Sequence, residues 1–438
     1  MASSAGRVPS SNSRSGYTPN VYWRSPTFQE LRRLPGYRAL PPPGFVELRC
    51  EACAPFFRQD STEWAALHSG RVTTSALPGV LGMKERITSL KLKLPKGYAS
   101  HHHALKAFDL LREPSFATPE AEKGGGRREA LQFNASQVEA YNDELARLVA
   151  EDSDCFDEED EAERQARWRR SKQAGKSGAM SVHCSFGLAQ EPAALFSLMA
   201  AVGMGETLEV GLCPLAKESI PREWKVDKGN LPPLGASPDG LLTIPLSDLG
   251  RAEEGSLARR IAEAVGGDGA AGSDRWGKDG NLCCVVEIKS VSPFREVVKR
   301  TKSGKRKKRR YKLIDAEPRD GVQVLHVPQL QMHMLCTGAP AALYMSFSAG
   351  HGMAIYVVKA DKFYQRCMLR WVARFVKEFV KRDVQPPHDF WHDLAPYQAF
   401  LGHTRSIARK ARMVDLVPPT VMAKHKDSKP FLKLENLL

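Results

Sequence analysis

The sequence predicts a mixed α/β (α+β) fold in which helices flank a central sheet and large polar insertions interrupt the chain. Residues 282–290 are mostly apolar and β-branched, and Gly and Pro flank them, which predicts a buried strand. Residues 342–347 and 353–358 have the same character and are joined by a Gly-containing turn. Residues 328–335 and 361–381 predict helices, the second of them amphipathic. Such a mixture is typical of a sheet covered by helices.

The composition limits the class of protein. The chain has 438 residues, 42% of them hydrophobic, and its formal net charge of +14 gives a pI near 9.3. This positive charge points to a polyanionic partner, most often nucleic acid; an anionic membrane surface or a merely soluble basic surface are the alternatives. The longest apolar run, residues 192–204, is too short and broken to span a bilayer, so we expect no membrane partner. Nine scattered cysteines suit a reducing, intracellular compartment.

Residues 41–400 are expected to form a single domain between two tails. The first 40 residues are rich in Ser, Arg and Pro without an acid before Glu30, which fits a disordered tail or an organellar transit peptide. Residues 401–438 are expected to be a basic tail, loosely ordered from Arg405. Polar inserts are expected at about residues 121–180, 246–280 and 300–315.

A phosphate-binding turn is predicted around Gly70. The residues from Trp64 to His68 predict a helix that stops before this glycine, and a short extended piece follows. A new helix is then expected to begin with Thr74 or Ser75 as its cap. Free N–H groups and hydroxyls at such a helix start can hold a phosphate.

Two acidic residues precede the central strand. Glu191 is expected in the first turn of a helix that starts at Gly187, where the helix dipole favours a carboxylate. A strand is expected over residues 207–213. Asp239 lies in a turn that leads into a short strand, and residues 246–280 are expected to form a loop or hairpin.

The central strand carries a carboxylate and an ammonium on one face. Because side chains alternate along a strand, Glu287 and Lys289 project with Val285, whereas Val286 and Ile288 project from the other face. Burying either charge alone is costly. A salt bridge at the strand end is one explanation, and a catalytic site is the other.

A dense basic run spans residues 302–312. Phosphate contact, a nuclear localisation signal and a solvated charge run are the competing interpretations. Its place between two candidate motifs favours phosphate contact, with Lys305 and Arg306 as the binding residues. The compartment therefore stays open between an organelle (chloroplast or mitochondrion) and the nucleus.

The acids on separate elements predict a metal site. Mg²⁺ prefers oxygen ligands, with Mn²⁺ as a substitute, and Asp239, Glu287 and the Ile288 carbonyl could supply them. Glu191 would complete the acidic set. Metal-bound water is a better nucleophile, and Lys289 would orient or deprotonate it, or stabilise the charge that builds on the phosphate.

Five motifs, which follow one another along the chain, resemble those of the lambda exonuclease and YqaJ-like viral recombinase family of the PD-(D/E)xK nuclease superfamily. The resemblance covers about residues 60–385 and implies a restriction-endonuclease-like core. It rests on five motifs: Trp64…Gly70-x-x-Thr73-x-Ser75, Gly187-x3-Glu191, Ser237-Pro238-Asp239-Gly240-Leu241, Glu287-Ile288-Lys289 and Gln329-x-Gln331.

The resemblance also implies a role for each matching residue. Glu191, Asp239 and Glu287 would be the acids of the metal site, Lys289 the catalytic lysine, and Gln329 the residue that orients the attacking water or the scissile phosphate. These five residues form the implied catalytic set.

Phosphate contacts are implied as well. Ser75 would contact the 5′ or scissile phosphate, and Thr73 and Gln331 belong to the same DNA-binding motifs. The family often has an arginine where this chain has His68, so Arg71 or the basic run 302–312 could supply that contact.

An iron–sulfur cluster is not expected. The related branch with a cluster has a Gln-x3-Tyr motif and a C-terminal cysteine trio. Here His333 and Leu335 follow Gln329 and Gln331 four residues later, and no cysteine follows Cys367.

The function implied by the resemblance is a Mg²⁺-dependent 5′→3′ exonuclease that digests duplex DNA ends in recombination, repair or DNA turnover. Family members of this branch form ring-shaped trimers and work with a single-strand annealing protein. The alternatives are a structure-specific endonuclease or nickase, and a nuclease-fold module that binds DNA without cutting it.

Overall fold

The computed structural model describes residues 27–41, 51–59, 61–112, 179–266, 281–297, 310–314 and 316–418. The basic residues Lys305 and Arg306, the insert 121–178 and the first 26 residues lie outside these ranges.

The helices and strands follow one another through the whole described chain. The α-helices are α1 (Phe28–Leu31), α2 (Thr62–Ala66), α3 (Leu77–Val80), α4 (Arg86–Lys91), α5 (His102–Arg112), α8 (Ala179–Val202), α9 (Leu246–Leu249), α10 (Leu257–Gly266), α11 (Val327–Thr337), α12 (Lys362–Phe375) and α13 (Ala395–Lys410). The short 3-10 helices are η3 (Glu51–Phe56), η4 (Lys96–Tyr98), η6 (Lys217–Ser219), η7 (Arg222–Trp224), η8 (Lys228–Asn230) and η10 (Val324–His326), and η11 (Val376–Val380) is a π-helical turn. The strands are β1 (Tyr37–Arg38), β2 (Glu206–Leu208), β3 (Cys213–Pro214), β4 (Gly235–Ala236), β5 (Gly240–Pro245), β6 (Asn281–Ser290), β7 (Phe294–Val297), β8 (Arg310–Leu313), β9 (Ala341–Ser348), β10 (Gly352–Lys359) and β11 (Arg412–Val417).

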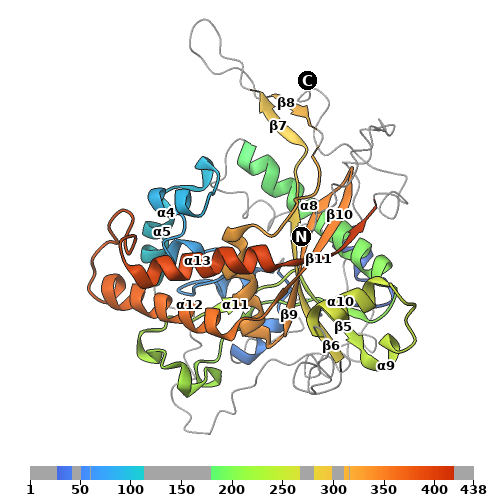
Figure 1. The fold of residues 1–438 in the computed structure, drawn as a ribbon, viewed down its shortest axis with the longest axis horizontal. Helices are drawn as coiled ribbons and strands as arrows, with labels where there is room; N and C mark the ends of the chain where they lie inside the picture. Colours follow the sequence, from blue (N-terminus) through green and yellow to red (C-terminus); the bar gives the residue numbers. More distant parts are fainter. Residues whose placement is uncertain are drawn as a thin grey trace, which may run out of the picture.

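A mixed sheet lies at the centre of the molecule (Figure 1). Its seven described strands have the order β1-β2-β5-β6-β9-β10-β11. The pairs β1–β2 and β6–β9 are parallel, and the other neighbours are antiparallel. The predicted central strand, β6, therefore lies between β5 and β9. The hairpin of β7 and β8 projects away from this sheet.

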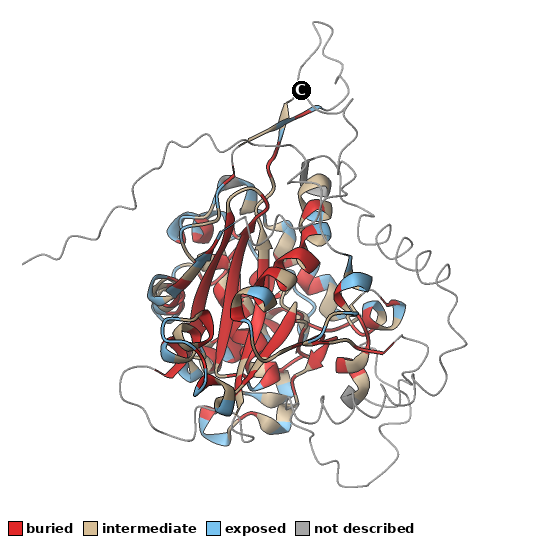
Figure 2. Ribbon diagram, turned by 90° about the vertical axis from the view of Figure 1, so that its right-hand side faces the viewer, coloured by how far each residue is buried: buried red, intermediate tan, exposed pale blue. Residues whose placement is uncertain are grey.

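Helices cover both faces of the sheet, which confirms the predicted α/β class in this coarse form. On one face, side chains of α3, α5, α11, α12 and α13 form one buried cluster with strand residues; on the other, those of α8 and α10 do. The strand residues are buried between these layers (Figure 2). Val285 packs on the first face and Val286 on the second, as the predicted alternation requires.

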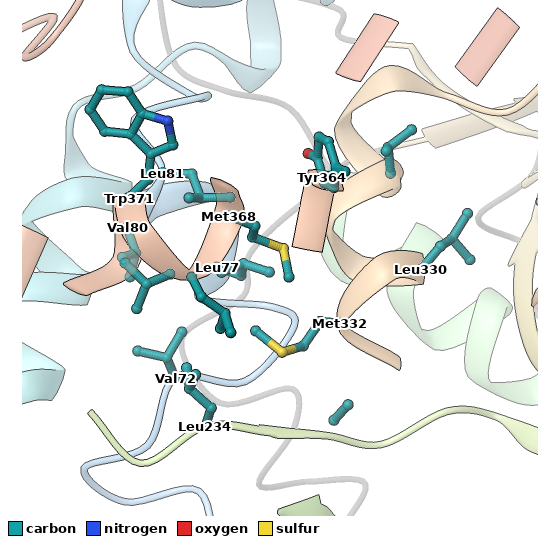
Figure 3. Close-up of a cluster of buried hydrophobic side chains, with 14 of the residues drawn as sticks. Val72, Leu77, Val80, Leu81, Leu234, Leu330, Met332, Tyr364, Met368 and Trp371 are labelled. Atoms are coloured by element: carbon teal, nitrogen blue, oxygen red, sulfur yellow. The ribbon is translucent and has the colours of Figure 1, made fainter. Parts of the chain in front are cut away.

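A buried cluster fixes the segment after α2 against the helices of the first face (Figure 3). Val72, Leu77 and Val80 come from this segment, and Met332 of α11 and Met368 of α12 lie opposite them. Val72 also forms a parallel bridge with Leu234. The predicted extended piece is therefore present, and the predicted phosphate-binding turn is held close to α11.

Several predicted elements are confirmed. The hairpin of β9 and β10 and the helix α11, with its proline in the first turn, have nearly the predicted bounds. Asp361 caps α12 by accepting a hydrogen bond from the Tyr364 N–H at 2.8 Å. The aromatic stripe of α12 and η11 is buried, so it belongs to the core, as predicted.

Four predicted boundaries are wrong. The tail expected over residues 1–40 ends earlier, because α1 and β1 lie within residues 27–40 and β1 pairs with β2 in the central sheet. The helix expected to start at Gly187 begins at Ala179 and is continuous through Pro192. Residues 246–266 contain α9 and α10 rather than a loop, because the apolar residues of α10 lie on one face and pack on the sheet. Residues 405–417 are not a loose tail, since they complete α13 and form β11, which pairs with β10.

The strand expected over residues 207–213 is interrupted. The chain leaves the sheet after Leu208, and the Gly211 N–H donates to the Pro55 carbonyl of η3 at 2.7 Å. A Cβ at Gly211 would lie 2.2 Å from the Phe57 carbonyl oxygen. Backbone contact with η3 therefore replaces strand pairing here, and only Gly allows that approach.

Among the described helices, none has the length and apolar character required to cross a lipid bilayer. The cysteines that are described are all free thiols.

Candidate active site

Glu287 lies at the centre of a polar cluster on β6, with only 2% of the residue exposed. Its Oε1 accepts hydrogen bonds from Lys289 Nζ and, at 2.6 Å, from Gln329 Nε2 of α11. His333, one helical turn beyond Gln329, places Nε2 2.9 Å from Glu287 Oε2. The central strand and α11 therefore bring together two of the predicted motifs.

Ionisation of Glu287 is strongly favoured despite its burial. Burial alone raises the pKa of this carboxyl, but the ammonium of Lys289 and the contact with His333 outweigh it, and the pKa falls to about 2. Burial lowers the pKa of Lys289, but Glu287 and Asp239 together raise it above its usual value. The pair is therefore a carboxylate and an ammonium at neutral pH.

Asp239 lies at the start of β5, beside β6. Its backbone N–H donates to the Val286 carbonyl at 3.0 Å, and its Oδ2 accepts from the Ile288 N–H at 2.6 Å. The side chain is thus held next to Glu287 by the neighbouring strand. The Ile288 amide serves this contact, an arrangement that the sequence did not predict.

The turn before Asp239 is held by residues from the N-terminal part of the chain. Gln59 Nε2 donates to the Pro238 carbonyl at 2.7 Å. Trp64 Nε1 donates to Ser237 Oγ at 3.0 Å. Two predicted motifs about 170 residues apart are therefore in direct contact, and Trp64 acts as a positioning residue for the Asp239 turn.

Glu191 belongs to the same electrostatic environment. Burial raises the pKa of Asp239 well above its usual value, and the charges of Glu287 and Glu191 raise it further. Glu191 lies in the middle of α8, not in its first turn, so the helix dipole does not explain its position. The predicted acids at 191, 239 and 287 are nevertheless brought together from a helix, a turn and a strand.

The predicted phosphate-binding turn is formed differently from the prediction. The first residue before α3 is Ala76, and no side chain caps this helix, so neither Thr74 nor Ser75 is its cap. Instead the Ala76 N–H donates to the Thr73 carbonyl at 3.0 Å, and Thr73 Oγ1 lies 3.2 Å from Ser75 Oγ. Ser75 is exposed, Thr74 is half-buried and Thr73 is buried, so Ser75 is the most exposed of the three hydroxyl residues.

Arg71 and His68 are turned toward the protein. Arg71 is 3% exposed, and its guanidinium donates to the Leu67 and Leu234 carbonyls at 3.2 and 2.9 Å. His68 places Nδ1 2.7 Å from the Trp64 carbonyl oxygen. Arg71 therefore makes structural contacts inside the protein, and a phosphate contact from this residue stays a prediction.

Gln331 makes structural contacts inside the protein, and its predicted DNA contact stays a prediction. It is fully buried, and its Nε2 donates to the Lys359 carbonyl while its Oε1 accepts from the Asp361 N–H, both at 2.9 Å. Residues two apart on a helix point in different directions. Gln329 therefore faces Glu287, whereas Gln331 joins α11 to the end of β10.

Besides His333, three further residues near the cluster were not predicted: His326, Lys84 and Arg319. His326, whose Nδ1 lies 3.1 Å from the Tyr344 hydroxyl, has its pKa lowered well below its usual value by burial and by the charges of Lys289, Arg319 and Lys84. Lys84 and Arg319, like Lys289, place positive charge within electrostatic reach of His326. Neither follows a sequence motif, because they lie on irregular segments and meet the site only through the fold.

The cluster supplies carboxylate oxygens, the donor type that hard divalent cations prefer, although the donor atoms of Glu191, Asp239 and Glu287 do not all lie within 4.8 Å of one another in the described structure. Glu287 Oε2 is buried and lies 2.9 Å from His333 Nε2. Asp239 and Glu191 bring further carboxylate oxygens to the same electrostatic environment, where they repel one another. Oxygen donors of this kind are the preferred ligands of Mg²⁺ and Mn²⁺. These three carboxylates are the residues that could hold such an ion.

Comparison with known proteins adds no family to this description: no family model, no curated protein and no solved structure matches the chain.

Proposed function

We propose that this protein is a metal-dependent deoxyribonuclease. The observation that supports the proposal best is the position of Asp239, which is held against β6 by the Ile288 N–H at 2.6 Å and lies within electrostatic reach of Glu287, Glu191 and Lys289. A purely structural ion pair would need only Glu287 and Lys289. The additional carboxylates raise the free energy of the folded protein unless a cation balances them.

The residues of the site suggest how the reaction would proceed. A bound Mg²⁺ would activate a water molecule and neutralise negative charge on the phosphodiester. The charges of Glu287 and Asp239 raise the pKa of Lys289, so its side chain is a cation that would stabilise negative charge on the phosphate. Gln329, which donates to Glu287, would hold this carboxylate and keep its amide next to the scissile phosphate.

Positive charge around the site favours a nucleic acid as substrate. Lys84 and Arg319 lie within electrostatic reach of His326, next to Lys289. The chain as a whole carries a formal charge of +14. Cations at this position would attract the phosphate backbone and make binding sensitive to salt.

The proposed exonuclease direction, 5′→3′ on duplex ends, rests on the resemblance of the motifs to the lambda exonuclease and YqaJ-like family. The ring-shaped trimer and the single-strand annealing partner are predictions from the same resemblance.

The test is digestion of linear duplex DNA labelled at the 5′ or the 3′ end, with covalently closed circular DNA as control, with and without Mg²⁺. Purified protein should release label from linear DNA only with the metal. Lys289→Ala and Asp239→Asn should lose cleavage by roughly a hundredfold or more, while the exposed Lys362→Ala should cut like the wild type.

Each outcome of this test separates the candidate functions. Cutting of the circular DNA would identify an endonuclease or nickase. Salt-sensitive binding without any cutting would identify a DNA-binding module and overturn the proposed chemistry. Equal activity of Lys289→Ala and wild type would overturn the assignment of this site.

A further inference from the structure

A second group of possible metal ligands lies on a different part of the chain. Glu85 precedes α4, His101 precedes α5, and His388 lies on the segment between η11 and α13. One donor atom from each residue can be chosen so that all three lie within 4.8 Å of one another. The group is formed by three segments that are up to 303 residues apart in the sequence (388 − 85 = 303).

The carboxylate of the group is firmly held. Glu85 is 1% exposed, and its Oε2 accepts a hydrogen bond from the Asp389 N–H at 3.2 Å. Its Oε1 lies 3.0 Å from His101 Nδ1. Asp389 in turn accepts from the Ile87 N–H at 2.7 Å. The backbone around the group is therefore fixed before any ligand binds.

The two imidazoles lie side by side at the protein surface. The ring centroids of His101 and His388 are 4.0 Å apart with an angle of 34° between the ring planes. His101 is half-buried and His388 is exposed. Solvent therefore reaches the group, and the His388 ring can turn without disturbing the core.

We propose that Glu85, His101 and His388 bind a divalent transition metal, with Zn²⁺ as the best match. Two imidazole nitrogens and one carboxylate oxygen form a donor set that Zn²⁺ uses, with water as the fourth ligand. Tetrahedral bonds of about 2.0–2.1 Å require donor atoms about 3.4 Å apart. The pair of Glu85 and His101 already meets this spacing within a few tenths of an ångström. A rotation of the exposed His388 ring would complete the site.

This site differs in chemistry from the carboxylate cluster around Glu287. The imidazole nitrogens favour Zn²⁺ over Mg²⁺, whereas the oxygen-only cluster favours Mg²⁺. A bound ion at Glu85 would link the start of α4, the start of α5 and the segment before α13. It would therefore stabilise the fold, and its test does not depend on nuclease activity.

The experiment is titration of the full-length, metal-free protein with Zn²⁺, followed by calorimetry and thermal unfolding. Wild-type protein should bind zinc at this site and unfold at a higher temperature once loaded. His101→Ala and His388→Ala should each weaken this binding at least about tenfold and lose the thermal shift. His102→Ala, which changes the exposed neighbouring histidine, should behave like the wild type.

Cobalt provides a direct readout of the ligands. Co²⁺ added to the wild type should give visible absorption bands of a low-coordinate ion, and His388→Ala should lose them. Because His388 is exposed, this variant should fold normally. If zinc binds wild type, His101→Ala and His388→Ala with equal affinity, or binds none of them, the residues form only an ion pair and the proposal is overturned.

Discussion

Replacing Asp239 by Asn should stabilise the metal-free protein although it removes a residue of the proposed catalytic site. The pKa of Asp239 is raised by burial and by the charges of Glu287 and Glu191. A group with a raised pKa in the folded state contributes full stability below its unfolded pKa, and this contribution is lost as the pH rises through the folded pKa. At neutral pH the Asp239 charge is therefore unfavourable for folding.

The magnitude follows from the contacts. Each unit by which the pKa is raised corresponds to about 1.4 kcal/mol at a pH above the folded value. Asparagine keeps an oxygen that can accept from the Ile288 N–H, so the hydrogen bond at 2.6 Å is retained. Because Asp239 is half-buried, solvent screens part of this repulsion, and we expect the Tm to rise by a few degrees.

Thermal unfolding in EDTA at pH 8 and pH 4 measures this effect. Asp239→Asn should unfold at a higher temperature than the wild type at pH 8, and the difference should shrink at pH 4, where the wild-type carboxyl is protonated. Asp239→Ala should be less stable than Asp239→Asn, since the Ile288 N–H then lacks its acceptor. The exposed Asp320→Asn is the control and should change little. An Asn variant less stable than the wild type at pH 8 would refute the charge-repulsion argument.

Three further predictions test other parts of the structure. Gln329→Ala should slow DNA cleavage roughly tenfold to a hundredfold with little loss of stability. Gln331→Ala should instead lower the free energy of unfolding by about 1–3 kcal/mol, because it leaves the Asp361 N–H and the Lys359 carbonyl unpaired. Cleavage kinetics and urea unfolding of both variants distinguish the two roles. Arg32→Ala should destabilise the protein by about 3–5 kcal/mol, because it leaves the buried Glu209 carboxylate without the guanidinium whose Nη2 lies 2.5 Å from its Oε1. Adding Glu209→Gln to this variant should recover part of the lost stability in the same unfolding assay. Chelation by EDTA should stop cleavage, and either Mg²⁺ or Mn²⁺ should restore it; cleavage that persists in EDTA would contradict the metal-dependent reaction.

The central strand shows how far the sequence alone could predict the site. The alternation along β6 placed Glu287 and Lys289 on one face, and the structure confirms this face and their mutual contact. The partner His333 could have been predicted from its spacing, because residues four apart lie on the same side of a helix and Gln329 was already a candidate. Local periodicity is thus sufficient to predict a site residue when the direction of its side chain depends only on the strand or helix to which it belongs.

Other side chains could not be assigned from local periodicity. Arg71 resembles a phosphate-binding residue in the sequence, yet its guanidinium donates to carbonyls inside the protein. The basic residues Lys84 and Arg319 carry no motif and approach the site from irregular segments. Their directions depend on packing between segments that are distant in the sequence.

The sequence by itself determined the mixed α/β class, the central strand, the β9–β10 hairpin and the helix α11, because hydrophobic periodicity and turn residues act over a few neighbouring positions. Only the tertiary structure decided where the acids lie relative to one another, which glutamine faces Glu287, and that Trp64 holds the turn before Asp239. These contacts join residues tens to hundreds of positions apart, so their geometry depends on how the sheet and its helices pack.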